Sequence, residues 1–135
     1  MTPNARLLAT YDLATALETS GRSVDAVTSA WLRAKRGLSN FEVGEVIERL
    51  YAQLRHQARL NWWIERAERK PSARGRFLVW LALREKLSVA DIRVLMSTHE
   101  GEAQALSGRE AAMLTGLAGA ELEHADMPEL VRMEC

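Results

Sequence analysis

The sequence has few of the features that place a protein outside the cytoplasm or in a membrane: cysteines, a signal peptide and long apolar runs. Its 135 residues include one cysteine, Cys135, so an internal disulfide is excluded and a reducing compartment is expected. The first residues lack a long apolar segment followed by a small-residue cleavage site, so we expect no signal peptide. No apolar run approaches the roughly 20 residues that span a bilayer. We therefore expect a cytoplasmic protein with no membrane partner.

Residue patterns typical of catalytic and metal sites are also missing. His56, His99 and His124 are far apart, and no cysteine or carboxylate stands at a spacing that would complete a tetrahedral metal site. No glycine-rich phosphate loop follows a strand pattern. A nucleophilic Cys135 would need a base and a pocket, which a chain terminus rarely supplies. We therefore predict no catalytic, metal-binding or cofactor-binding residue, and an enzyme housed wholly in this chain is the weakest hypothesis.

What the chain does have is helical periodicity along its whole length. β-Branched residues are few and do not alternate with polar residues, so no strand is predicted. Thr2-Pro3 predicts a helix from residue 3 to about residue 20, ended by Gly21. Further starts are predicted from hydroxyl caps and capping-box spacings; they lie after Ser23, Ser39, Ser88 and Ser107, with one more at residues 126–128. The pattern predicts seven or eight short helices in an all-α fold.

Two segments show how these helices should pack. Residues 77–83 (FLVWLAL) are apolar on every side, which predicts a central, buried helix. Residues 45–70 contain no glycine or proline, but their apolar face shifts by about a quarter turn along the segment. This shift predicts a helix break between about residues 55 and 61, or one helix that contacts two different neighbours.

Charge is distributed unevenly although the formal net charge is zero. Residues 1–86 hold 15 Lys and Arg against 9 Asp and Glu, whereas residues 87–135 hold 3 against 9. All eight aromatic residues precede residue 87. A basic, tryptophan-bearing region followed by an acidic one is typical of a surface that faces a polyanion, most often nucleic acid.

The densest basic stretch supplies the candidate site. On a helical wheel Arg59, Trp62, Arg66 and Arg69 lie together, opposite an apolar face that includes Trp63. Guanidinium groups bind phosphate, and an exposed indole stacks on an unpaired base. Arg74 and Arg76 stand near a helix start, where the helix dipole disfavours cations, and this conflict favours a functional role. The predicted RNA-binding residues are Arg55, Arg59, Trp62, Arg66, Arg69, Lys70, Arg74 and Arg76. The competing interpretation is a solvated face, partly neutralised by glutamates, with Trp62 packed on an adjoining domain.

Three segments together resemble one protein family. Residues 48–69 (ERLYAQLRHQARLNWWIERAER), 83–96 (LREKLSVADIRVLM) and 126–135 (DMPELVRMEC) are similar to the N-terminal, NusB-like domain of bacterial Sun/NOP-type RNA cytosine-5 methyltransferases. The resemblance implies a NusB-like bundle of two packed helical subdomains that binds RNA. It implies a NusB-like domain at residues 1–125 and, at 126–135, the start of a linker toward a catalytic domain missing from this chain.

In that family the catalytic domain binds S-adenosylmethionine and carries cysteines in Pro-Cys and Thr-Cys motifs. Neither motif occurs here, so the activity is carried by no residue of this chain. The resulting expectation is an RNA-binding accessory domain that positions ribosomal or transfer RNA for a separate methyltransferase domain, with ribosomal RNA as the expected partner. The alternative is a docking module that contacts the catalytic domain or another protein without touching RNA, with Trp62 as an interface anchor.

Overall fold

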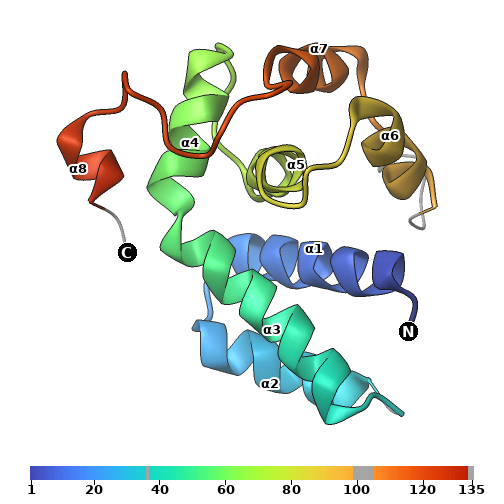
Figure 1. Cartoon of the computed structure of the whole chain (residues 1–135). Helices are drawn as coiled ribbons and strands as arrows, with labels where there is room; N and C mark the ends of the chain where they lie inside the picture. Colours follow the sequence, from blue (N-terminus) through green and yellow to red (C-terminus); the bar gives the residue numbers. More distant parts are fainter. Residues whose placement is uncertain (36, 99–104, 134–135) are drawn as a thin grey trace. The chain divides into compact units, whose positions relative to one another are not determined.

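The computed structural model describes residues 1–35, 37–98 and 105–133, and in these ranges the chain forms eight α-helices and no strand (Figure 1). The all-α prediction is thereby confirmed. His99 and Cys135 lie outside the described residues. The chain divides into two compact units, residues 1–54 and 55–135. The helices are α1 Pro3–Ser20, α2 Val24–Ala34, α3 Asn40–Arg55, α4 Gln57–Arg66, α5 Ala73–Leu83, α6 Val89–Ser97, α7 Gly108–Gly116 and α8 Glu129–Arg132.

Five of the predicted helix starts are confirmed by their cap hydrogen bonds, and the start predicted at residues 126–128 is followed by α8 without a side-chain cap. The predicted hydroxyl caps each accept a hydrogen bond from the backbone N–H three residues further on; they are Thr2, Ser23, Ser39, Ser88 and Ser107. At α7 the Glu110 carboxylate also accepts from the Ser107 N–H at 2.9 Å, which completes the capping box. These bonds satisfy amides that have no partner within the helix.

Residues 1–54 form a unit of three helices, α1 to α3. Its core joins apolar side chains from all three helices: Ala9, Leu13, Val27, Val46 and Leu50. The Thr10 hydroxyl is buried and donates to the Val46 carbonyl at 3.3 Å, so this polar group ties α1 to α3. A buried hydroxyl with a partner avoids the free-energy cost of an unsatisfied donor.

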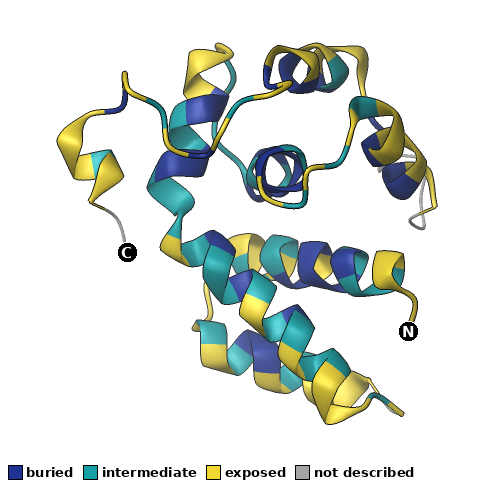
Figure 2. Cartoon of the chain, in the orientation of Figure 1, coloured by how far each residue is buried: buried dark blue, intermediate teal, exposed yellow. Residues whose placement is uncertain are grey.

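Residues 55–135 form a unit built around α5, which contacts α4, α6 and α7. The side chains of residues 77–81 are all buried, and Figure 2 shows α5 as mostly buried. The prediction of a central helix at 77–83 is confirmed, since a helix that is apolar on all sides is stable only when every side is covered. Within the described ranges no helix combines the length and apolar character that crossing a bilayer requires.

The predicted break in the long glycine-free segment is also confirmed. The first helix, α3, ends at Arg55, and α4 begins at Gln57. Between them His56 has backbone angles of φ −105° and ψ 18°, outside the α-helical range. The change of apolar face along the segment therefore reflects two helices with different neighbours.

The end of α4 differs from the expectation that helical spacing continues to Arg69. The last helical residue is Arg66, and Glu68 adopts the left-handed conformation with φ 60°. The Glu68 N–H donates to the Glu65 carbonyl at 2.9 Å, and the Arg69 N–H donates to the Ile64 carbonyl at 3.2 Å. This hydrogen-bond pair is a Schellman motif, which ordinarily places glycine at the left-handed position. Arg69 therefore lies beyond the helix and off the face predicted for it.

The segment after α7 lies against α4. Leu122 and Met127 are buried, and the Trp63 indole N–H donates to the Leu122 carbonyl at 2.7 Å. The short helix α8 also contacts α4. The predicted start of a linker is residues 126–135, and its described part, 126–133, thus belongs to the same compact unit as α4.

Candidate nucleic-acid interface

The structure separates the predicted basic residues into three groups. Arg55 and Lys70 are exposed on the surface. Three others contact groups of the protein itself: Arg59, Arg74 and Arg76. Arg66 and Arg69 line a pocket. The sequence therefore identified a basic region whose members lie in different environments.

The expectation that Arg59 lies on the exposed face of α4 is wrong. Its residue is only 8% exposed, and its guanidinium donates to the backbone carbonyl of Arg132. Its Nη1 also lies 3.1 Å from the His56 Nδ1. The helical wheel places Arg59 on the correct side of α4, but the C-terminal segment covers that side. Because Arg59 is buried and donates to the Arg132 carbonyl, its role is structural: it holds the C-terminal segment against α4.

Arg74 forms a two-point ion pair with Glu110. The Arg74 Nε is 2.7 Å from Glu110 Oε2 and its Nη2 is 3.0 Å from Oε1, while Nη2 also donates to the Ala105 carbonyl at 3.1 Å. Burial alone raises the pKa of Glu110, but hydrogen bonds from Arg74 and Ser107 outweigh it and hold that pKa below the ordinary value of 4.5. The unfavourable position of Arg74 near a helix start is therefore compensated by the Glu110 carboxylate. Arg76 likewise donates to the Asn61 side chain at 3.2 Å.

Trp62 is half-buried, so the expectation of an exposed indole is corrected. Its ring stacks on His124 with centroids 5.3 Å apart and an interplanar angle of 29°. The Arg66 guanidinium carbon lies 4.9 Å from the centroid of the Trp62 ring. Trp63, assigned to the apolar face from the sequence, is buried as predicted. Trp62 is thus a platform that orients Arg66, which is a cation–π arrangement.

Arg66 keeps much of its surface open to solvent. Its Nη1 lies 3.3 Å from Asp126 Oδ2, and the two side chains are 47% and 68% exposed. Ion pairs this exposed contribute little to stability because water screens them. An incoming anion therefore competes with Asp126 for Arg66 at small cost.

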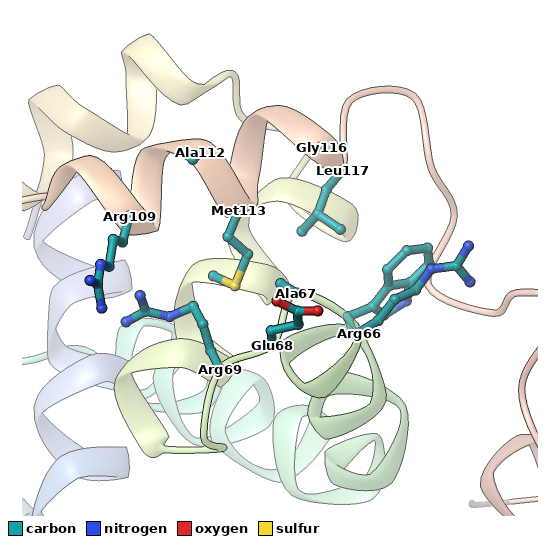
Figure 3. A pocket seen from close by; sticks show the side chains of 10 residues that line it. Arg66, Ala67, Glu68, Arg69, Arg109, Ala112, Met113, Gly116 and Leu117 are labelled. Carbon is teal, nitrogen blue, oxygen red and sulfur yellow. The ribbon is translucent and has the colours of Figure 1, made fainter.

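The pocket lies between the end of α4 and α7, with a volume of about 600 Å³ (Figure 3). Trp63 and Leu117 contribute apolar surface, together with Met113 of α7. The charged lining residues are Arg66, Glu68, Arg69 and Arg109. Both walls belong to residues 55–135, so the pocket is contained in one compact unit.

Arg109 is the functional candidate that sequence reasoning missed. It is the second residue of α7, where the helix dipole disfavours a positive charge. The same signal drew attention to Arg74, and applied to residue 109 it would have marked this side chain. Arg69 and Arg109 have no ion pair and no side-chain hydrogen bond to any residue within the described ranges. Figure 3 shows their guanidinium groups extending toward the same end of the pocket.

The chemistry available here is recognition of an anion. Two guanidiniums without a carboxylate partner in the described part of the chain offer paired donors to phosphate oxygens. Within the same ranges no three His, Cys, Asp or Glu side chains are grouped so as to hold a metal ion. Searches against protein-family models, curated proteins and solved structures found no match to this chain.

Proposed function

We propose that the chain binds RNA through the pocket between α4 and α7. The observation that carries the proposal is the placement of Arg69 and Arg109 on one pocket with no acidic partner among the described residues. Two like charges directed at one space repel each other, and a phosphate relieves that repulsion while accepting hydrogen bonds from both. Arg66, held by Trp62 and only weakly paired, is a third lining cation, and Figure 3 shows its guanidinium on the opposite side of the pocket from Arg69 and Arg109.

The role proposed for this binding is that of an accessory domain. The resemblance of residues 48–69, 83–96 and 126–135 to Sun/NOP-type methyltransferases supports a partnership with a separate catalytic domain that uses S-adenosylmethionine. In this arrangement the chain supplies affinity for RNA, and the catalytic domain supplies the chemistry. On the same resemblance we propose that the helices are arranged as in NusB-like domains.

The test is RNA affinity of the full chain measured by fluorescence anisotropy at several salt concentrations. The RNA is a labelled hairpin with a single-stranded loop, and the variant is R69E/R109E. We expect weaker binding and a slope of log affinity against log salt reduced by about 0.7, because the two arginines share one phosphate and each phosphate contact on a single strand contributes about 0.7. Circular dichroism verifies that the helices persist.

The matched control is R93E. Arg93 is exposed on α6 and does not line the pocket, so R93E reverses the charge of one arginine away from the site and is compared with R69E and R109E made singly. We expect R93E to leave the salt slope unchanged. An R69E/R109E protein with the affinity and salt slope of the parent chain would refute RNA binding by this pocket.

A docking function is favoured by one different observation. Leu130 of α8 is 86% exposed and Met133 is 66% exposed, and exposed apolar side chains close together mark contact surfaces. If docking on a catalytic domain is the main function, L130E would abolish co-purification with that domain and leave RNA affinity unaltered. The two functions thus predict opposite effects of the pocket and α8 variants.

A further inference from the structure

We propose that the pocket receives a single unpaired nucleotide and selects guanine through the Glu68 carboxylate. This inference rests on the proposed RNA binding and specifies what the pocket recognises. The observation behind it is that Glu68 lines a pocket whose other charged lining residues are all arginines.

The size and lining of the pocket suit one base rather than a duplex. A volume of about 600 Å³ falls within the range of sites that enclose small molecules. Met113, Leu117 and Trp63 form the apolar floor of the pocket, each only 6% exposed, so a base would contact their exposed edges, and a methionine sulfur packs favourably against aromatic rings. Proteins read single-stranded RNA by taking unstacked bases into such surroundings, with phosphate contacts alongside.

Glu68 is held in an unfavourable backbone conformation at this position. Its φ of 60° lies in the left-handed region, which is unfavourable for a residue with a side chain and which glycine adopts freely. The Schellman motif at the end of α4 would be satisfied equally well by glycine. A glutamate here places a carboxylate in the pocket, and Figure 3 shows that side chain between Arg66 and Arg69.

Glu68 is an exposed residue on the rim of the pocket, where its carboxylate repels phosphate and attracts hydrogen-bond donors of a base. Glu68 has no ion pair or side-chain hydrogen bond within the described ranges. An ionised carboxylate accepts only, through two oxygens. Guanine presents two adjacent donors on its Watson–Crick edge, N1–H and the N2 amino group, which match those oxygens. Adenine and cytosine present one amino donor beside a ring acceptor, and uracil presents one N–H between two carbonyls that repel the carboxylate.

The experiment uses four labelled hairpins with one stem and a uracil-rich loop whose central nucleotide is G, A, C or U. We expect the parent chain to bind the G loop about tenfold more tightly than the U loop, within the range of a good two-point base contact. In E68Q we expect this preference to fall at least severalfold, because an amide both donates and accepts. We expect E68G to lose the preference while becoming more stable, since glycine removes the backbone strain.

The control is E65Q, which neutralises an exposed glutamate of α4 that does not line the pocket. E65Q should keep the preference for G. Equal affinity of the parent chain for all four loops, or a G preference that E68Q retains, would overturn the selection of guanine. Either result leaves RNA binding intact if R69E/R109E still weakens it, so failure of the two proposals is distinguishable.

Discussion

Breaking the Arg74–Glu110 ion pair should destabilise the unit formed by residues 55–135 in a pH-dependent way. In R74A the Glu110 carboxylate loses two charge-assisted hydrogen bonds, at 2.7 and 3.0 Å, and keeps the bond from the Ser107 N–H. The Glu110 side chain is only 7% exposed, so its charge stays poorly hydrated. Removing one partner of a buried pair costs about 3–5 kcal/mol. Because the Arg74 side chain is 21% exposed and water reaches the vacated site, we expect a loss at the low end of this range, about 3 kcal/mol.

The sign of the pH dependence follows from the pKa of Glu110. In the parent chain that pKa lies below its ordinary value of 4.5, so the pair stabilises the fold above pH 4.5 and loses its contribution as pH falls through the lowered pKa. In R74A burial remains while the hydrogen bonds and the charge of Arg74 are gone, so the pKa of Glu110 should be higher than in the parent chain. On acidification, protonation of Glu110 then relieves the variant at a higher pH than in the parent chain. The difference in unfolding free energy between the parent chain and R74A should therefore be largest at pH 7 and smaller at pH 4.

The assay is urea unfolding followed by tryptophan fluorescence at both pH values. Three of the four tryptophans, Trp62, Trp63 and Trp80, lie in residues 55–135, so the signal reports mainly on this unit. The matched variant is E110Q, since glutamine preserves the capping box while removing the charge. The double variant R74A/E110Q closes a thermodynamic cycle, in which we expect a coupling of at least about 1 kcal/mol. Strictly additive losses, or a loss from R74A of the same size at pH 4 and pH 7, would refute the reasoning.

Two further predictions concern packing. A Cβ at Gly75 would lie 3.1 Å from Ile64 Cδ1 and 3.2 Å from the Ser72 hydroxyl, so G75V should lower the unfolding free energy by about 1–3 kcal/mol. The contrasting variant is G44A, where an added Cβ meets no atom within 4 Å. In the same urea assay the unfolding free energy of G44A should rise by about 0.5–1 kcal/mol, because alanine is favoured over glycine inside a helix. Equal effects at the two glycines would contradict this packing. Removing the Arg59 guanidinium in R59A should release the Arg132 carbonyl, so hydrogen exchange measured by mass spectrometry should accelerate in α8 and not in α6; unchanged exchange in α8 would show that Arg59 does not hold this segment.

The local signals in the sequence were sufficient for the helices. Each hydroxyl cap accepts a hydrogen bond from an amide three residues away. Ser107 and Glu110 therefore predict the start of α7 from local sequence alone. The apolar segment 77–83 likewise reveals a buried helix, because only full coverage stabilises it. The change of apolar face that predicted the break near His56 is also a property of neighbouring residues.

The candidate site depended on contacts between residues distant in sequence. Arg59 and Arg132 are 73 residues apart, and Arg74 and Glu110 are 36 apart, so no helical wheel reveals that the first guanidinium is covered or that the second has a partner. The left-handed residue at the end of α4 is Glu68 and not glycine, so the sequence does not indicate this turn. Because the helix ends there, Arg69 lies beyond it and lines the pocket. The sequence alone determined which segments are helical and that the middle of the chain is basic, because these depend on neighbours within a few residues. Only tertiary packing decided which cations remain available to a ligand, because that depends on what the rest of the chain places over them.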